Sequence, residues 1–322
     1  MSSPSLIIFR KELGDAVRSR LVLLLVAGLG AIAILSVIVA SAAFHAKVMD
    51  YQHYLDALKQ AGGTAPTAPL FFPLQLLRGA VEYLEIIGAI VAIVIGYGMT
   101  AKEKNRGTLR LLFSRPVSGR AIAVGKLLAL AVIWLAVVAA VGVVMLVSLR
   151  LIGGAGLSSL ELTKLAITLG LSWIYLFLWS ALAMGLAGFT KQLSTALVIG
   201  LILWLGFVLI IPQIGDTMDP DNQVPGGLFK SLQVDKPHEK AVMAHFAGYE
   251  RTRNFLEVTS ISKHYERGSF GYLGVKDKYN QLSLGPITKD MWSNVAWLIA
   301  GAALAAGLAI TQTTKRKLLR RA

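Results

Sequence analysis

The chain has 322 residues, of which 55% are hydrophobic and only 16% are charged. Soluble domains carry about 25% charged residues, so this composition favours an integral membrane protein and excludes an ordinary soluble enzyme or a disordered chain. The sequence contains no cysteine, which excludes disulfides, thiolate nucleophiles and cysteine-ligated metals. Its formal net charge is +14, and the meaning of that charge depends on where the basic residues lie.

The first segment, residues 1–20, is predicted to contain an amphipathic helix over residues 4–20. Ser3 is suited to cap this helix and Pro4 to occupy its first position. The predicted apolar face consists of Leu6, Phe9, Leu13, Ala16 and Val17. Such a helix lies along a membrane surface. Two interpretations remain open, a simple interfacial anchor and a docking surface for a cytoplasmic partner.

Six later segments are each long and apolar enough to cross a bilayer, with roughly 19–25 residues for about 30 Å of hydrocarbon. Their predicted bounds are 21–43, 80–101, 127–149, 165–189, 193–211 and 291–310. Backbone polar groups must be hydrogen-bonded internally in lipid, so each segment is predicted to be a helix. The expected fold class is therefore an all-α integral membrane protein with six transmembrane helices.

Six spans place both termini on the same side of the membrane. On that side lie the N-terminal segment, residues 102–126, Lys191 and the C-terminal tail, which together carry 17 lysines and arginines against three acidic residues. By the positive-inside rule this side is cytoplasmic, and the chain is expected in the cytoplasmic (inner) membrane. Topology and contact with lipid headgroups thus account for the basic charge, and no nucleic-acid partner is predicted.

Two longer segments are predicted on the outer side. Residues 44–79 form a first loop, and residues 212–290 form a larger extracytoplasmic loop domain between the fifth and sixth spans. A helical stretch is predicted from about Glu239, whereas residues 267–286, where glycine alternates with aromatic and charged residues, are predicted to be loop or short strands. The predicted domains are 1–20, 21–211, 212–290 and 291–322, the last holding the sixth span and a basic tail.

Motifs for catalysis or metal binding are nearly absent from the sequence. Gly125-Lys126 resembles the end of a phosphate-binding loop, but Arg120 stands at the upstream glycine position and Leu127 replaces the Ser or Thr that would bind magnesium. The five histidines all fall on the predicted outer side and are interpreted as ordinary surface residues. We therefore expect no catalytic residue, metal or cofactor in this chain.

Two carboxylates, Glu82 and Glu85, lie near the outer end of the second span. Acidic residues inside a membrane are costly and often functional. Arg78, however, is four residues before Glu82, which favours an ion pair on the helix surface. Both a structural role and a position at the outer end of a translocation path remain open for these two residues.

The most informative segment is residues 102–126, which read KEKNRGTLRLLFSRPVSGRAIAVGK. Leu109, Leu112 and Phe113 form an apolar ridge on a predicted short helix, which ends before Pro116. A stiff helix that connects two spans would tilt both when pushed. The alternative is a basic surface hairpin held by lipid headgroups.

This segment resembles the permease subunits of type-2 ABC transporters. The matching residues are Glu103, Gly107, Thr108, Leu109, Leu111, Leu112, Ser114, Pro116, Val117, Gly125 and Lys126. Residues 9–15, together with Arg18 and Arg20, match the Arg-Lys-Glu-Leu opening of the same family, and the chain is similar to the branch that includes the permease serving maturation of nitrous-oxide reductase. It departs from the family pattern at Asn105, where a second acid is usual, and at Ile261, where the outer loop often has Ser-Pro.

The resemblance implies the membrane-spanning subunit of an ATP-driven exporter. Two copies of this permease, or one copy and a related chain, would pair and bind two separate ABC ATPase subunits that hold ATP and magnesium. The residues implied to couple this chain to the ATPase are Glu103, Arg106, Gly107, Thr108, Leu109, Leu112, Phe113 and Pro116. The implied contact residues of the N-terminal interface helix are Phe9, Lys11, Glu12 and Leu13.

Two other functions remain open. A mechanotransmission or scaffold subunit would relay ATPase motion to an extracytoplasmic partner docked on residues 212–290, without moving a solute. A secondary transporter or channel without a motor is disfavoured because the spans lack ion pairs deep in the membrane. The mostly aliphatic span interiors favour an apolar or amphipathic cargo over an ion.

Overall fold

A computed structural model describes residues 3–61, 70–105, 117–154, 156–218, 231–232 and 236–313. Within these ranges the protein is helical and contains no strand. The elements are α1 (Pro4–Arg18), α2 (Leu21–Ala61), η1 (Pro73–Leu77), α3 (Arg78–Tyr83), η2 (Leu84–Gly88), α4 (Ala89–Asn105), α6 (Gly119–Leu151), α7 (Ser159–Phe189), α8 (Leu193–Trp204), η3 (Leu205–Ile210), α9 (Ile211–Thr217), α11 (Lys236–His245), α12 (Ala247–Thr259), α13 (Ile261–Leu273), η5 (Asp277–Tyr279) and α14 (Leu284–Gln312).

Six helical segments are long and apolar enough to cross a membrane, which confirms the predicted number of spans. Each predicted span lies within one of these segments. Two of them are composite. The second span, Pro73–Lys104, runs through η1, α3, η2 and α4, and the fifth, Leu193–Thr217, runs through α8, η3 and α9. Each composite span contains one π-helical stretch, η2 or η3.

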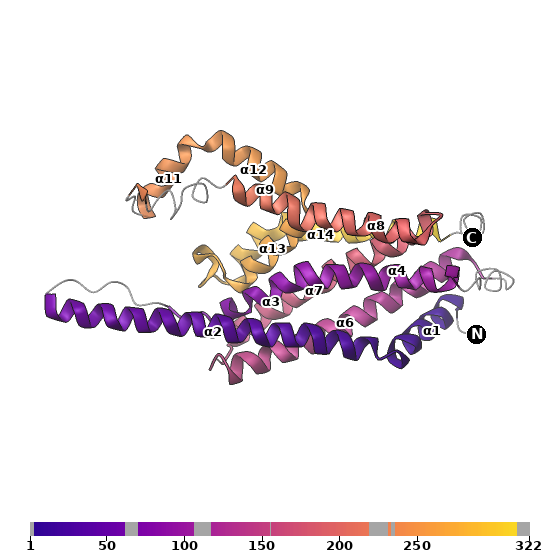
Figure 1. The fold of residues 1–322 in the computed structure, drawn as a ribbon, viewed down its shortest axis with the longest axis horizontal. Helices are drawn as coiled ribbons and strands as arrows, with labels where there is room; N and C mark the ends of the chain where they lie inside the picture. Colours follow the sequence, from indigo (N-terminus) through magenta and orange to yellow (C-terminus); the bar gives the residue numbers. More distant parts are fainter. Residues whose placement is uncertain are drawn as a thin grey trace.

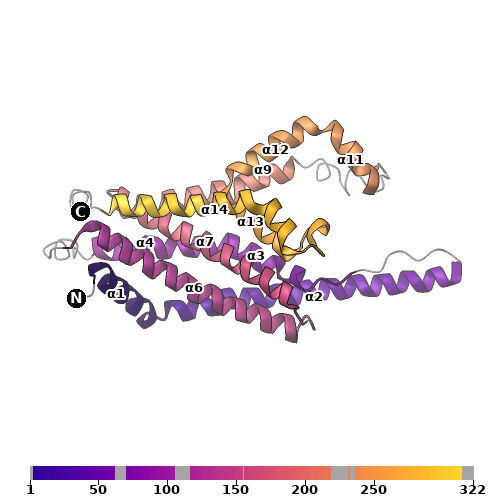
Figure 2. The same cartoon turned by 180° about the vertical axis from the view of Figure 1, so that it is seen from behind.

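Helix α7 forms the centre of the bundle. It packs mainly against α14 and α4 and also contacts α13 and α6 (Figures 1 and 2). The backbones of α4 and α7 meet at Gly96, where an added Cβ would lie 1.9 Å from the carbonyl oxygen of Ser180. Only glycine permits this approach. Trp134 of α6 donates to the Ser180 hydroxyl at 2.7 Å, so the same point also fixes α6.

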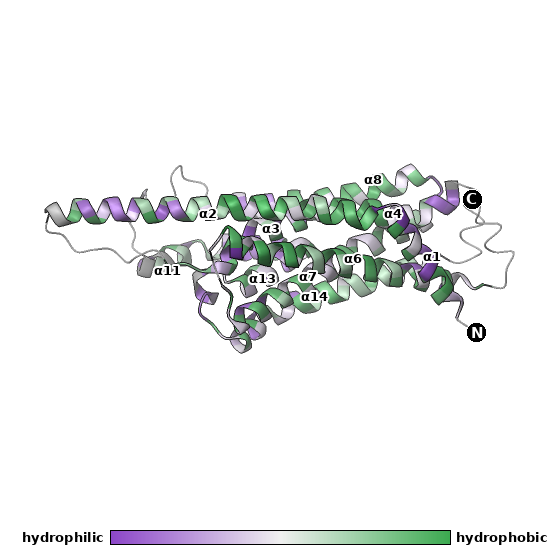
Figure 3. Ribbon diagram, turned by 90° about the horizontal axis from the view of Figure 1, so that it is seen from below, coloured by the Kyte–Doolittle hydropathy of each residue, from purple (hydrophilic) through white to green (hydrophobic). Residues whose placement is uncertain are grey.

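The bundle has two distinct ends. At the first, called the terminal end here, lie α1, the C-terminal ends of α4 and α14, and the start of α6 (Figure 1). At the opposite, far end, α2 extends well beyond the other spans, since its 41 residues reach about 60 Å at 1.5 Å per residue. The predicted first outer loop, residues 44–79, therefore begins as helix up to Ala61. Figure 3 shows that this extension is more hydrophilic than the rest of α2.

Helix α1 starts as predicted at Pro4, but Ser3 makes no side-chain cap. The face that packs on the bundle also differs from the predicted apolar face. Glu12 and Ala16 are buried, whereas Leu6 and Val17 are exposed. The reason is electrostatic, because Glu12 meets a buried lysine of α6. This ion pair, together with the burial of apolar side chains, therefore determines which face of α1 packs on the bundle.

The segment between the fifth and sixth spans is also helical where it is described. The predicted helix from about Glu239 is divided into α11 and α12, which meet at Phe246. Residues 267–273 belong to α13, so the prediction of loop or strand is wrong there. The sequence of α13 shows no apolar helical periodicity because its buried face against α7 is rich in small and polar residues, such as Ser262 and Ser269.

The start of α13 accounts for one departure from the family pattern. Ser260 caps the helix by accepting a hydrogen bond from the Lys263 backbone N–H at 3.3 Å. Ile261 follows as the first helical residue, which is the position that proline favours. A Ser-Ile pair thus fits the same place as Ser-Pro and keeps the helix start. At the other end, Gly274 adopts a left-handed conformation (φ 66°) that terminates α13.

Candidate functional site

Two oppositely charged residues flank the connection between the second and third spans. Glu103 lies in the last turn of α4, and Lys126 lies near the start of α6, which Ser118 caps by accepting from the Ala121 N–H at 3.2 Å. The Lys126 ammonium is 3.0 Å from the Glu103 carboxylate, and the lysine side chain is only 1% exposed. The same ammonium also donates to the carbonyl of Met99. This ion pair closes the base of the connection.

Helix α1 adds two more charges to the pair. Glu12 lies 3.3 Å from the Lys126 ammonium. Lys11 bridges the two acids, at 3.1 Å from Glu12 and 3.3 Å from Glu103. We call Lys11, Glu12, Glu103 and Lys126 the base cluster. It joins three helices with two positive and two negative charges.

The charges of the base cluster shift the pKa values of its two α1 members, Glu12 and Lys11, toward their ionised forms. Burial alone would raise the pKa of the Glu12 carboxyl, but the positive charges of Lys126 and Lys11 outweigh it and hold this pKa below its usual value. Burial would lower the pKa of Lys11, and the adjacent Glu12 and Glu103 carboxylates raise it above its usual value instead. Removing one member would leave the opposite charge buried without its partner.

Gly125, the residue before Lys126, allows α1 to approach α6 closely. A Cβ at Gly125 would lie 2.6 Å from the backbone oxygen of Ser5 and 2.9 Å from the Ile8 Cβ. Glycine therefore permits α1 to lie directly on α6. The Gly125-Lys126 pair, which resembles the end of a phosphate-binding loop, has a packing and ion-pairing role in this structure.

Lys104 connects the same region to the centre of the bundle. Its ammonium donates to the carbonyls of Ala187 at 3.1 Å and Thr190 at 2.8 Å. Both acceptors lie at the C-terminal end of α7, where the helix dipole favours a positive charge. The ends of α1, α4, α6 and α7 are thus connected by direct polar contacts at the terminal end.

The structure brings together three of the predicted site residues, Lys11, Glu12 and Glu103. Phe9 and Leu13 are half-buried, and Leu13 packs against the core. The other predicted coupling residues lie outside the described residues, namely Arg106, Gly107, Thr108, Leu109, Leu112, Phe113 and Pro116. Lys126 is the member of the base cluster that the predicted site lacks. A lysine among apolar residues at the start of a span was the signal for it.

The two acidic residues of the second span lie in different environments. Glu82 pairs with Arg78 at 2.8 Å, which confirms the predicted surface ion pair. Glu85 is buried in η2, and its backbone carbonyl accepts from the Tyr175 hydroxyl at 3.0 Å. Its carboxylate interacts electrostatically with Glu266 and Lys263 of α13. Glu85, rather than Glu82, therefore borders the charged far end of the bundle.

One histidine corrects the interpretation of all five as surface residues. His264 is buried, and its two ring nitrogens contact the Asn294 side chain at 2.9 Å and the Val258 carbonyl at 3.0 Å. These contacts pin α13 to α14 and to the end of α12. Among the described residues, no group of three or more His, Asp or Glu side chains is arranged to hold a metal ion.

The fold and the base cluster define a multi-pass membrane protein of six spans with a polar cluster at the base of one inter-span connection. The chain matches the family model described as "ABC-2 family transporter protein" over residues 6–311. It therefore belongs to this family and is a permease subunit of an ABC transporter. Family membership implies partnership with an ABC ATPase subunit. A comparison with curated proteins finds no match to the chain.

Proposed function

We propose that this permease subunit is non-catalytic and that a separate ABC ATPase drives it to export a substrate across the cytoplasmic membrane. The observation that carries the proposal is the base cluster. Glu103 precedes the connection 106–116 and Lys126 follows it, and their ion pair joins the two sides of this connection to α1. A force applied to the connection would reach α4 and α6 together.

The contacts around the base cluster give this force a defined route. Lys104, next to Glu103, is bonded to the C-terminal end of α7. Helix α7 in turn packs against α4 and α14. A displacement of the connection would therefore move the central helix as well as the two helices that flank it, which is the rigid-body type of switch known for transporters.

The distribution of charge supports a cytoplasmic position for the terminal end. The 17 basic residues assigned to this side greatly outnumber its three acidic ones. ATP and magnesium would be held by the ATPase, which works in the cytoplasm, and its cleft would receive the apolar ridge of Leu109, Leu112 and Phe113. Helix α1 would lie beside the ATPase with Lys11 exposed.

The proposed assembly contains two permease chains and two ATPase subunits. The fifth span is the least covered of the six within this chain, which supports it as the surface that meets a second copy. The transporter would then be symmetric, with one connection 106–116 above each ATPase.

The proposed coupling to the ATPase is tested by replacing two apolar residues of the ridge with aspartate. In the double variant Leu109→Asp, Phe113→Asp, an affinity-tagged permease should lose co-purification of the ATPase and the transport that depends on it. Leu232→Asp at the far end, where the side chain is 55% exposed, is the matched control and should change neither. Unchanged ATPase binding and unchanged transport in the double variant would remove the assignment.

A second candidate function is the relay of ATPase motion to an extracytoplasmic partner without solute transport. The polar side chains of α7 support this second candidate because they form hydrogen bonds within the protein. Tyr175 bonds to Ser262 at 2.9 Å and Ser172 to Tyr265 at 2.8 Å, so α13 would move with α7. The resemblance to the nitrous-oxide-reductase maturation branch would make that partner a maturation factor.

Shortening the outer segment separates the two candidates. Replacing residues 231–258 by a short linker removes α11 and most of α12 but keeps α13 on the bundle. A relay subunit should lose its outer partner while ATPase binding persists. An exporter should keep transport.

A further inference from the structure

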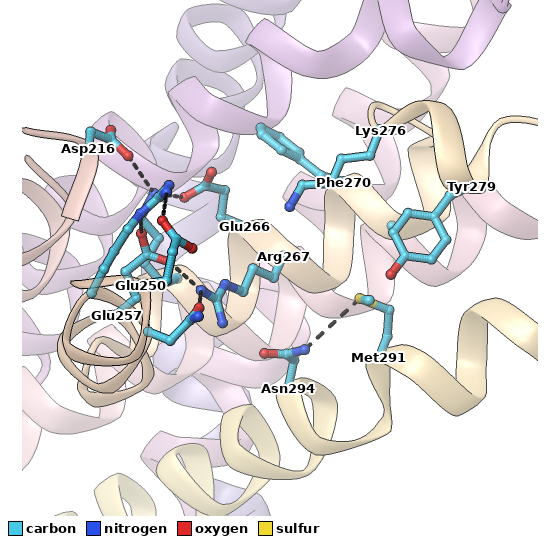
Figure 4. A pocket seen from close by; sticks show the side chains of 14 residues that line it. Asp216, Glu250, Glu257, Glu266, Arg267, Phe270, Lys276, Tyr279, Met291 and Asn294 are labelled. Carbon is cyan, nitrogen blue, oxygen red and sulfur yellow. Dashed lines mark hydrogen bonds and ion pairs between the residues drawn. The ribbon is translucent and has the colours of Figure 1, made fainter. Parts of the chain in front are cut away.

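A cavity of about 500 Å³ lies at the far end of the bundle, between α12, α13 and the start of α14 (Figure 4). It is separate from the base cluster. Its size falls within the range of small-molecule sites, about 300–1,000 Å³. Most of its lining is charged or polar, which is unusual for the entrance of an apolar path and suits a polar ligand.

One wall of the cavity is a network of ion pairs with more acids than bases. Its carboxylates are those of Asp216, Glu250, Glu257 and Glu266. Its cations are Arg253, Lys263 and Arg267. The pairs are short, at 2.8 Å from Lys263 to Glu266 and 3.1 Å from Arg253 to Glu257, and Arg267 also contacts Glu257. With four acids and three bases this wall carries one net negative charge.

The opposite wall carries a single positive charge. Lys276 lies across the cavity from Asp216 and Glu250, beside Tyr279 and Phe270 (Figure 4). The Lys276 side chain is exposed and makes no ion pair or hydrogen bond within the part of the chain that the structure describes. The two walls therefore have opposite net charge, and the positive one holds an ammonium available to a ligand.

The floor of the cavity lies at the level where the sixth span enters the membrane. Met291 and Asn294 form this floor, and Met291 is the first residue of the apolar stretch predicted for the span. Trp292, between them, is 64% exposed. Exposed tryptophans favour the headgroup region of a bilayer. The exposed tryptophan therefore supports a position of the cavity near the lipid headgroups.

We propose that this cavity binds the zwitterionic headgroup of an amphiphile, with a phosphate at Lys276 and an amine at the carboxylate wall. A purely anionic headgroup would satisfy Lys276 but face the net negative wall, and a purely cationic one would face Lys276. Only a ligand with both charges matches both walls. This inference concerns binding and stands independently of the coupling to an ATPase.

The test uses the full-length chain purified in an uncharged maltoside detergent and titrated by calorimetry. The probes are dihexanoyl phosphatidylethanolamine, the anionic dihexanoyl phosphatidylglycerol, and free phosphoethanolamine. The wild-type chain should bind the phosphatidylethanolamine at least tenfold more tightly than the phosphatidylglycerol. Equal affinity for the free headgroup would assign the ligand to a soluble molecule, and weaker binding of it would assign the ligand to a lipid; both outcomes support the headgroup chemistry.

Two variants test the two walls. Lys276→Glu should weaken phosphatidylethanolamine binding at least tenfold, whereas Lys289→Glu, an exposed lysine outside the cavity, should leave it unchanged. Asp216→Asn, at the most exposed carboxylate of the acidic wall, should reduce the preference for phosphatidylethanolamine over phosphatidylglycerol. Equal wild-type binding of both lipids, or equal effects of Lys276→Glu and Lys289→Glu, would overturn the proposal.

Discussion

The protein has a charged cluster at each end, and the two are built in different ways. At the terminal end, Lys11 contacts Glu103 across 92 positions of the chain, and Lys126 joins both α1 and α4. At the far end, most pairs of Arg253, Lys263 and Arg267 join residues that lie three to ten positions apart, and one longer contact links Lys263 to Asp216 of α9 at 3.6 Å. The first cluster connects distant parts of the chain through short ion pairs, whereas the second mainly holds the neighbouring helices α12 and α13.

The two clusters are therefore suited to different roles. A cluster that joins α1, α4 and α6 transmits a displacement of one helix to the others. A cluster centred on α12 and α13 stiffens the outer segment and shapes the cavity beside it. Breaking the base cluster should therefore affect both stability and coupling, whereas breaking the far-end cluster should affect stability and the cavity but leave the coupling unchanged.

The largest effect is expected from Lys126→Met. The substitution leaves Glu12 and Glu103 with the half-exposed Lys11 as their remaining cation in the base cluster. Removing one partner of a buried pair costs about 3–5 kcal/mol. Thermal unfolding in detergent should show this loss. Lys278→Met is the control, because its pair with Asp290 is exposed to solvent and such pairs contribute little to stability.

A neutralised cluster sharpens the same prediction. Combining Lys126→Met with Glu12→Gln and Glu103→Gln removes the uncompensated charges, so part of the stability should return. ATPase binding should stay impaired, since the connection is no longer tied to α1. Unfolding of Lys126→Met at the same temperature as the Lys278→Met control would contradict a stabilising role of the base cluster.

A smaller effect is expected at the far end from Arg267→Met. Glu257 loses one cation but keeps Arg253 at 3.1 Å, so the cost should be about 1.5–3 kcal/mol, typical of a hydrogen bond to a charged group. Unfolding would be followed as for Lys126→Met. Co-purification of the ATPase should be unchanged, and its loss would show that the two ends are not separate in function.

The contact between α1 and α6 is tested by Gly125→Leu. The new side chain would overlap the backbone of Ser5, and overpacking of this kind costs about 1–3 kcal/mol. Limited proteolysis should cut α1 faster in this variant. Gly14→Ala on α1 itself, where an added Cβ meets nothing within 4 Å, is the matched control. Equal cleavage of the two variants would mean that α1 does not depend on this approach.

The smallest effect is the response to acid. The pKa of Glu12 lies below its usual value because Lys126 and Lys11 outweigh burial. Its contribution to stability is therefore complete above the ordinary glutamate pKa of about 4.3 and is lost as the pH falls through the lower folded value. A single cysteine introduced by Ala16→Cys, at a buried position of α1, should stay protected from a pulse of dithiodipyridine at pH 5 and become reactive only in more acidic buffer. Rising reactivity between pH 7 and pH 5 would contradict this account of Glu12.

The sequence predicts well what depends on local composition. Six apolar segments of sufficient length predict the six spans of the structure. The coupling role that the motif around residues 102–126 predicts for Glu103 stays a prediction, and the structure places this residue in the base cluster. The sequence does not predict that Lys126 and Glu12 meet, because proximity between distant positions has no periodic signal. It also mispredicts residues 267–273 of α13 as loop or short strands, because the buried Gly268, Ser269 and Gly271 carry no apolar helical period.

The most direct test of the account is the sidedness and protection of the connection 106–116. The chain has no cysteine, so Leu112→Cys provides a unique label site. In membrane vesicles of known orientation, a membrane-impermeant maleimide should modify this cysteine only from the cytoplasmic face, and the bound ATPase should protect it. Modification from the outer face, or equal modification with and without the ATPase, would contradict the claim that this permease is driven through that connection.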